Sequence, residues 1–294
     1  MKDFERIMNR KRTVFIISSI VFVIAFAVLA VFVIPRNKYS FPMDVNKLDV
    51  VIVGDSLFCN KSFIVEEKTL GDVLKDELDC EMQNCSIGGT CASRLNNENE
   101  LDFYSDMLGF YNVSNMIVTG NKSSISDNAR NLTGTFPDAH FRLSFLVGTD
   151  MSKEDILIVN YGINDALLRV PVKSDDLYDE YTYSGAMRRG IERIVKRYPD
   201  LKIVLGEVTY STLILFGEED EYYDEVTQEY RNAYNEELKK IADEFPNVYY
   251  FDFSSNTKID AGNYDKYLTD GIHFNEEGKK IYASALADFI GEIK

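Results

Sequence analysis

A long apolar segment near the N-terminus restricts this chain more than any other feature. Residues 14–34 contain no charged side chain and consist almost entirely of Ile, Val, Phe, Ala and Leu. In an α-helix with a rise of about 1.5 Å per residue, 21 residues cross a hydrocarbon layer of roughly 30 Å. A buried core helix would keep a polar stripe, whereas this segment has only Ser18 and Ser19. The segment therefore predicts a transmembrane helix.

A cleaved signal peptide is the main alternative for this segment. Its apolar region normally runs about 7 to 15 residues and ends in small residues, whereas this one is longer and closes on Val33, Ile34 and Pro35. Five basic residues precede the segment, and Arg36 and Lys38 follow it closely. By the positive-inside rule we expect a cytoplasmic N-terminus over 1–13, an uncleaved anchor over 14–34, a linker over 35–46 and an extracytoplasmic domain over 47–294.

The charge of the chain excludes one class of partner. The formal net charge is −16, and the N-terminal 34 residues are net basic, so the outer domain is more acidic than the whole. Such a surface repels phosphate polymers, and we expect no nucleic-acid partner. With 45% hydrophobic and 27% charged residues, the outer domain has the composition of a globular protein.

Apolar runs of strand length alternate with helical patterns along the outer domain. Strands are expected at 48–53, 156–161, 202–208 and 248–253, and helices at 66–79, 184–198, 219–245 and 275–293. Strands separated by helices predict a three-layer α/β/α sandwich with a mostly parallel sheet. Residues 96–150 do not follow this alternation of strands and helices. We interpret them as an insertion over the active-site edge, and ordinary strand and helix units are the alternative.

The four cysteines lie close together in the sequence, at Cys59, Cys80, Cys85 and Cys91. In an oxidising exterior they could form two disulfides in any of three connectivities, and the sequence leaves this open. Their irregular spacing and the scarcity of histidine disfavour a zinc site.

A candidate nucleophile follows the first expected strand. That strand runs directly into Gly54-Asp55-Ser56-Leu57. In a parallel α/β sheet, ligands bind beyond the carboxyl ends of the strands, so the Ser56 hydroxyl is placed to project into that crevice. Glycine and aspartate are also ordinary turn residues, and a plain turn is the alternative reading.

The chain has only two histidines, which narrows the choice of a general base. His273 lies in Asp270-Gly271-Ile272-His273, just before the last expected helix. An aspartate three residues before a histidine in a turn can accept the ring N–H, fix the tautomer and stabilise the imidazolium. A satisfied turn histidine is the alternative for His273, and we interpret His140 as structural.

Two further turns carry groups that an acyl-transfer enzyme needs. The first is Gly88-Gly89-Thr90, where a glycine lets a backbone N–H approach a developing oxyanion. The second is Gly162-Ile163-Asn164-Asp165, where the Asn164 amide can donate another hydrogen bond to the same oxygen. Taken singly, each is an ordinary Gly/Asn turn.

Taken in order, these four short blocks resemble those of the GDSL esterase/lipase family, also called SGNH hydrolases. The resemblance spans residues 49–294. It implies a flavodoxin-like sheet, with Ser56 as nucleophile, His273 as base and Asp270 as its partner. It also implies oxyanion donors at Ser56, Gly89 and Asn164, and gives Asp165 no catalytic role. The segment of ~70 residues between the second and third blocks is longer than the family usually has, which affects the expected access of substrate.

The expected function is an extracytoplasmic serine esterase that needs no metal or cofactor. By the resemblance, its substrates are acetyl or other short acyl esters of glycans or cell-wall polymers, with lipid esters as a further option. An O-acyltransferase would use the same triad with a sugar hydroxyl as acceptor, and a non-catalytic surface binding module could share the fold. The sequence alone does not separate hydrolase from transferase.

Overall fold

The computed structural model describes residues 47–59, 68–95, 108–120, 139–212 and 221–293. The chain divides into two units, Met1–Asn46 and Lys47–Lys294, of which the second is described below. The predicted cytoplasmic segment 1–13, transmembrane helix 14–34 and linker 35–46 lie outside the described residues. Of the helices that are described, none combines the length and the apolar character needed to cross a membrane.

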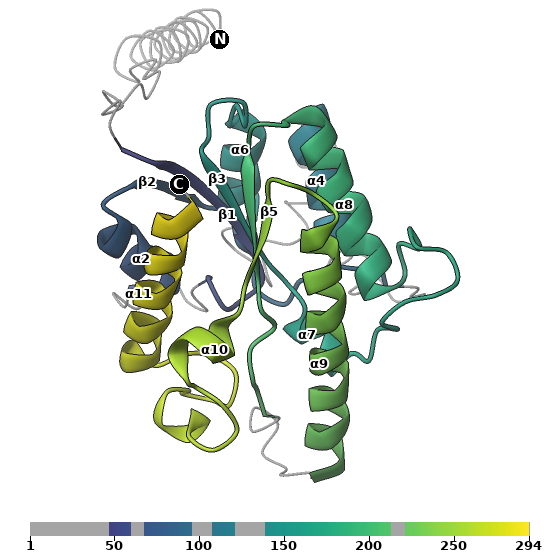
Figure 1. Cartoon of the computed structure of the whole chain (residues 1–294), viewed down its shortest axis with the longest axis vertical. Coiled ribbons are helices and arrows are strands. Elements are labelled where there is room, and N and C mark those ends of the chain that lie inside the picture. The colour runs from purple at the N-terminus through teal and green to yellow at the C-terminus, as the bar shows by residue number, and fades with distance from the viewer. Residues whose placement is uncertain (1–46, 60–67, 96–107, 121–138, 213–220, 294) are drawn as a thin grey trace, which may run out of the picture. The chain divides into compact units, whose positions relative to one another are not determined.

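A five-stranded parallel sheet forms the centre of the second unit (Figure 1). Its strands are β1 (Asp49–Gly54), β2 (Glu81–Asn84), β3 (Ile156–Asn160), β4 (Lys202–Gly206) and β5 (Val248–Phe251). Their order is β2-β1-β3-β4-β5, and every neighbouring pair is parallel. This is the order of flavodoxin-like sheets, so the expected fold class is confirmed for the described unit.

The inner strands β1, β3 and β4 are largely apolar because both faces of the sheet are covered there, whereas the edge strand β2 is Glu-Met-Gln-Asn. Val50 and Ile52 of β1 belong to one buried cluster, whereas Val51 and Val53 belong to the other. Successive side chains of a strand point to opposite faces, so a continuous Val/Ile run fills two cores at once. Burial on both faces explains why the inner strands are hydrophobic runs in the sequence.

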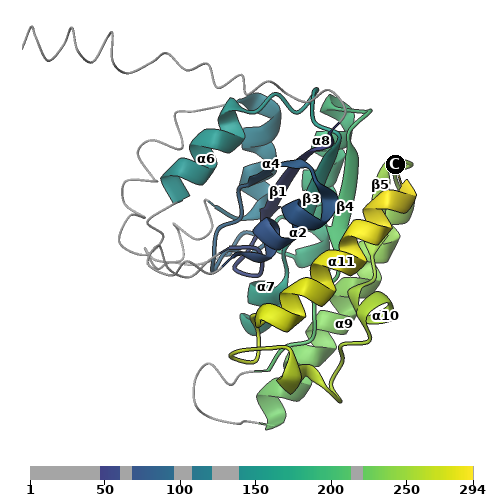
Figure 2. The same ribbon diagram turned by 90° about the vertical axis from the view of Figure 1, so that its left-hand side faces the viewer.

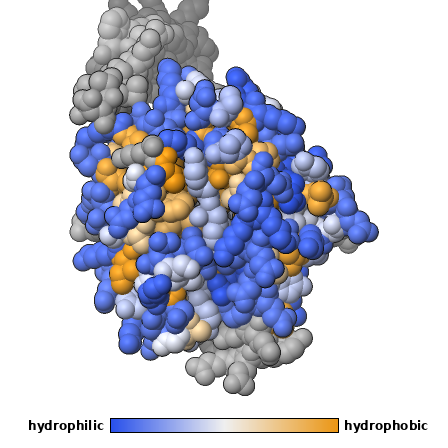
Figure 3. Space-filling model, viewed as in Figure 1, coloured by the Kyte–Doolittle hydropathy of each residue, from blue (hydrophilic) through white to orange (hydrophobic). Residues whose placement is uncertain are grey.

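Helices cover the two faces as separate layers (Figures 1 and 2). On one face α2 (Leu70–Leu78) packs against α11 (Glu276–Ile293), beside the short α10 (Phe253–Thr257). On the other face α8 (Tyr183–Arg197) packs between α4 (Phe110–Thr119) and α9 (Glu221–Asp243). The remaining helices are α6 (Ala139–Gly148), α7 (Ile163–Leu167) and the 3₁₀ turn Tyr264–Lys266. Hydrophilic residues cover most of the molecular face seen in Figure 3.

The described parts of the 96–150 region contribute to the core. Helix α4 lies against α8, and its Phe110 and Val113 are buried in the cluster under that face. Gly190 of α8 makes this contact possible, because a Cβ there would lie 2.4 Å from the Phe110 ring. The region therefore contains ordinary helix units, which was the alternative interpretation. Residues 96–107 and 121–138 lie outside the description, and the expected cover over the active-site edge stays a prediction.

The cysteines do not form two disulfides. Cys80 and Cys85 are buried free thiols in the clusters on opposite faces of the sheet. Burial raises the pKa of the Cys80 thiol to about 11 and that of the Cys85 thiol to about 12. The two-disulfide option that the sequence left open is therefore wrong, because these side chains fill apolar core positions.

Candidate active site

The four sequence blocks meet at one end of the sheet. Ser56 follows the carboxyl end of β1, Gly88 and Gly89 follow β2, and Asn164 lies in α7 directly after β3. His273 lies in the loop just before α11, and this loop is at the same end of the sheet. Parallel strands place their carboxyl ends side by side, so residues far apart in the sequence come together here.

Ser56, His273 and Asp270 form a continuous chain of contacts. His273 Nε2 lies 2.8 Å from Ser56 Oγ. On the other side of the ring, His273 Nδ1 lies 2.8 Å from Asp270 Oδ2 and 3.0 Å from Asp270 Oδ1. Because a carboxylate accepts, Nδ1 carries the proton, which leaves the Nε2 lone pair facing the serine hydroxyl.

The Asp270–His273 turn is held by its own backbone. Asp270 Oδ1 accepts hydrogen bonds from the backbone N–H groups of Ile272, at 3.2 Å, and His273, at 2.8 Å. The same carboxylate thus fixes the turn and contacts the imidazole. The side chains of His273 and Asp270 are 17% and 23% exposed, so the pair is largely shielded yet reachable at the surface.

The Gly54–Leu57 turn is fixed by a buried carboxylate. Asp55 is 1% exposed and accepts a hydrogen bond from the Leu57 N–H at 3.0 Å, while its own N–H donates to the Asn160 carbonyl at 3.1 Å. Loss of hydration raises the pKa of the Asp55 carboxyl to about 7, opposed by backbone N–H groups that include that of Ile163. Asp55 therefore connects the turn that carries Ser56 to the turn that carries Asn164.

The second block lies against the serine. A Cβ built on Gly88 would be 3.4 Å from Ser56 Cβ, so a side chain there would be in van der Waals contact with the serine. Gly89 is exposed and has a φ of 76°, in the left-handed region that favours glycine. The expected oxyanion donor Gly89 thus belongs to a loop that passes beside Ser56.

Asn164 reaches the same loop. Its Nδ2 donates a hydrogen bond to the Thr90 carbonyl at 2.9 Å. An amide nitrogen carries two hydrogens, so this contact fixes the side chain and leaves one N–H to donate elsewhere. Gly162, just before α7, has a φ of 134°, and a Cβ there would lie 2.5 Å from Val208 Cγ2. Only glycine allows the turn that presents Asn164.

Asp165 has a role that the sequence did not reveal. It is completely buried and accepts hydrogen bonds from the N–H groups of Ala92, at 2.8 Å, and Ser93, at 3.1 Å. The Ser93 hydroxyl donates a third, at 2.6 Å. Burial raises the pKa of this carboxyl above its ordinary value, while the three donors oppose that effect. The only sequence signal was its position next to Asn164.

Comparisons with known proteins identify the family and the fold. The sequence model of the GDSL-like Lipase/Acylhydrolase family matches residues 52–281. Among solved structures, Est24, a carbohydrate acetylesterase from Sinorhizobium meliloti, is 16% identical, covers 84% of this chain and 100% of its own, and has a TM-score of 0.50. A Lactobacillus plantarum protein is also 16% identical, covers 84% and 98%, and has a TM-score of 0.52. The comparison with curated proteins found no significant match.

The family match covers most of the chain and includes strands β2 to β5 and the end of β1. The chain therefore belongs to the GDSL-like lipase/acylhydrolase family. The structural likenesses support the same fold, and the protein is an ester hydrolase.

Proposed function

We propose that this ester hydrolase is a serine esterase in which Ser56 is the nucleophile, His273 the general base and Asp270 its partner. The observation that carries the proposal is the 2.8 Å contact between His273 Nε2 and Ser56 Oγ, continued by the 2.8 Å contact between His273 Nδ1 and Asp270. A nucleophile, a base and a carboxylate that orients the base are the parts that activate a serine hydroxyl.

The reaction follows from these contacts. His273 Nε2 takes the proton of the Ser56 hydroxyl as Oγ bonds to the ester carbonyl carbon, and the carbonyl oxygen gains a negative charge. The Ser56 and Gly89 backbone N–H groups and the free Asn164 amide N–H stabilise that oxyanion. When the tetrahedral intermediate collapses, the C–O bond to the alcohol breaks and His273 returns the proton to the leaving oxygen. Water then attacks the acyl-serine with His273 again as base, which releases the acid and restores Ser56.

The substrate class we propose is an acetyl or other short acyl ester on a glycan or cell-wall polymer. Support comes from the family and from the carbohydrate acetylesterase among the structures that share the fold. The 21-residue apolar segment at 14–34 supports a membrane anchor with the catalytic unit on the outer side. A strongly polyanionic substrate is disfavoured by the net charge of −16.

Turnover of p-nitrophenyl acetate by the full chain tests the enzymatic proposal. We expect wild-type protein to release nitrophenol and the Ser56→Ala variant to lose about 10⁴-fold or more of kcat. Equal rates for the two proteins would overturn the proposal and favour a binding module. Addition of glycan acceptors, followed by mass spectrometry of the glycan, separates the two fates of the acyl group. Free acid is the expected product, and acylated glycan would indicate a transferase.

Topology requires its own measurement. Alkaline phosphatase, which is active only outside the cytoplasm, is fused after residue 294 and, as a matched control, after residue 13. We expect activity only from the first fusion. Activity from the second fusion alone would reverse the proposed orientation, and release of the first into the medium would indicate a cleaved segment.

A further inference from the structure

A buried ion pair lies beyond the carboxyl end of β4, outside the proposed triad. Glu207 and Arg231 approach to 3.4 Å, and their side chains are only 6% and 13% exposed. Removing two charges from water is unfavourable unless further hydrogen bonds satisfy them. The hydrogen-bond partners of Glu207 and Arg231 therefore indicate which segments of the chain this ion pair holds in place.

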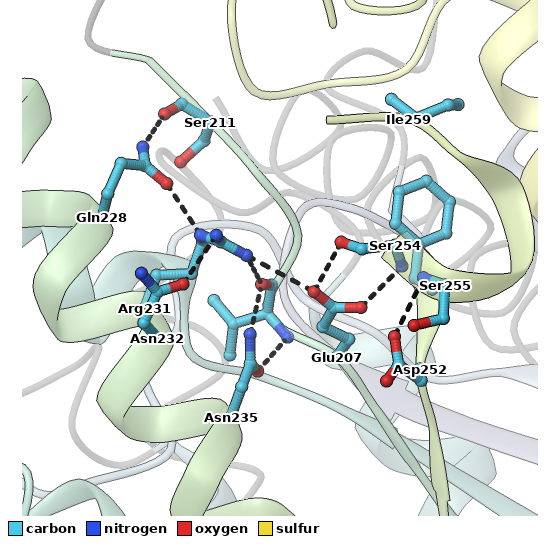
Figure 4. A network of polar contacts seen from close by, with 12 residues as sticks. Glu207, Ser211, Gln228, Arg231, Asn232, Asn235, Asp252, Ser254, Ser255 and Ile259 are labelled. Atoms are coloured by element: carbon cyan, nitrogen blue, oxygen red, sulfur yellow. Dashed lines mark hydrogen bonds and ion pairs between the residues drawn. The ribbon is translucent and has the colours of Figure 1, made fainter. Parts of the chain in front are cut away.

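Arg231 of α9 binds the segment that leaves β4, residues 207–212 (Figure 4). Its Nη1 donates to the Val208 carbonyl at 3.3 Å, and its Nε donates to Gln228 Oε1 at 2.7 Å. Gln228 in turn donates from Nε2 to the Ser211 carbonyl. Arg231 thus holds Val208 directly and Ser211 through Gln228.

Two other side chains complete the attachment. Asn235 of α9 accepts from the Val208 N–H at 2.9 Å and donates to the Val208 carbonyl at 3.0 Å, as a neighbouring strand would. Glu207 accepts from the backbone N–H and the hydroxyl of Ser254, at the start of α10, both at 2.7 Å. Segment 207–212 is therefore fixed between α9 and α10 (Figure 4).

The far end of this segment contacts the histidine turn. The Thr212 N–H donates to the Gly271 carbonyl at 2.7 Å, and Gly271 lies between Asp270 and His273 in the turn. The Tyr210 ring also packs against Tyr264, with ring centroids 4.9 Å apart, in the loop that leads to that turn. Hydrogen bonds and ring contacts thus run from Arg231 to the turn that carries the base.

We propose that Arg231 is a positioning residue for ester hydrolysis, because it holds segment 207–212 and, through the Thr212–Gly271 hydrogen bond, the turn that aims His273 at Ser56. This rests on the function proposed above. Displacement of a general base by about 1 Å from its nucleophile can lower the reaction rate by up to 10²-fold. A residue that positions the base can therefore affect kcat without contacting the substrate. Arg231 itself touches no reacting atom in this arrangement.

The fold offers a matched control. Arg188 of α8 is also buried, at 6% side-chain exposure, and binds the carboxylate of Glu244, just after α9, through Nε and Nη2. Its Nη1 donates to the Leu177 carbonyl, at 3.2 Å, rather than to segment 207–212. Arg188→Met therefore removes a buried arginine and its ion pair, whose carboxylate is 38% exposed, without touching the support of the histidine turn.

The test compares full-length wild type with Arg231→Met, Gln228→Leu and Arg188→Met. For Arg231→Met we expect kcat for p-nitrophenyl acetate to fall about tenfold with KM within twofold. Gln228→Leu removes the contacts to Ser211 and to Arg231 Nε but keeps the Arg231–Val208 contact, so its kcat should fall by less. Arg188→Met should also lower the melting temperature and should keep wild-type kcat at temperatures where all variants are folded.

A second readout does not depend on turnover. In a His140→Gln background His273 is the only histidine, so the ring signal of ¹³C-labelled histidine reports on it alone. We expect the signal to shift or broaden in Arg231→Met and Gln228→Leu and to stay unchanged in Arg188→Met. Wild-type kcat and ring signal in folded Arg231→Met and Gln228→Leu, with Ser56→Ala inactive, would overturn the positioning role and leave the esterase proposal standing. Full turnover by Ser56→Ala would overturn both.

Discussion

The buried carboxylate of Asp165 accepts two hydrogen bonds from Ser93, one from the Ser93 backbone N–H at 3.1 Å and one from the Ser93 hydroxyl at 2.6 Å. Asp165 follows Asn164 directly, and Ser93 lies in the segment that continues from Gly88 and Gly89. The two chain segments proposed to supply oxyanion donors are therefore fastened to each other by a residue that is itself completely buried. Preorganised donors stabilise a developing charge only while their positions are maintained.

Replacement of Asp165 by alanine tests this connection. The N–H groups of Ala92 and Ser93 would lose their acceptor inside the protein, and each unsatisfied buried donor costs about 1–3 kcal/mol. We expect a lower melting temperature together with a lower kcat, measured by calorimetry and p-nitrophenyl acetate turnover. Asp150→Ala is the control, since Asp150 accepts from the N–H and hydroxyl of Ser152 in the same pattern but at the surface. Equal effects of the two substitutions would contradict a special role for Asp165.

Asn164→Ala removes one proposed oxyanion donor. Because that hydrogen bond strengthens as negative charge develops, the loss should fall on kcat, by about 10²- to 10³-fold, and leave KM nearly unchanged. Steady-state kinetics on p-nitrophenyl acetate measure both constants. Asn256→Ala, which removes an exposed amide donating to the Asp252 carbonyl, should retain wild-type kinetics. A rise in KM without a fall in kcat would show that Asn164 binds the ground state instead.

Asp55 should make stability depend on pH. Its pKa is raised to about 7 in the folded chain, above the ordinary value of 3.8, mainly because burial disfavours the charged carboxylate. The folded state therefore binds the proton more tightly than the unfolded state. This contribution to stability is present below pH ~4 and is lost as pH rises towards about 7.

Urea unfolding of wild type and Asp55→Asn between pH 4 and pH 8 measures this contribution. An asparagine keeps an acceptor for the Leu57 N–H and cannot ionise. We expect the unfolding free energy of the variant to decline less than that of wild type over that range. Parallel curves would show that Asp55 keeps its ordinary titration in the folded chain.

The sequence predicted residues whose role depends on the chemistry of their side chain. It did not predict residues whose role depends on their neighbours in the folded structure. Ser56, His273 and Asp270 could be predicted as a group because few residue types activate a hydroxyl and the chain has only two histidines, and the structure places their side chains in contact. The central strands were found because burial on both faces leaves unbroken apolar runs. Helices α2, α8, α9 and α11 were predicted from helical periodicity, and their observed ends differ from the predicted ones by a few residues.

Features set by three-dimensional neighbours were missed. Asp165 and Arg231 look like ordinary charged residues in the sequence, and only the fold shows that they are buried against donors and acceptors far along the chain. Helix α4 was missed because its sequence, Phe-Tyr-Asn-Val-Ser-Asn-Met-Ile-Val-Thr, has β-branched and turn-forming residues and fits helical propensity poorly. Packing against α8 overrides that preference.

Covalent labelling of the nucleophile tests the central claim most directly. The full chain is incubated with a fluorophosphonate, whose phosphorus reacts with an activated serine hydroxyl as fluoride leaves, and the labelled peptide is located by mass spectrometry. We predict one adduct, on Ser56, abolished in Ser56→Ala and formed at least about 10²-fold more slowly in His273→Gln, because the base that takes the hydroxyl proton is missing. An adduct on another serine, or equal labelling rates with and without the His273 imidazole, would contradict the account.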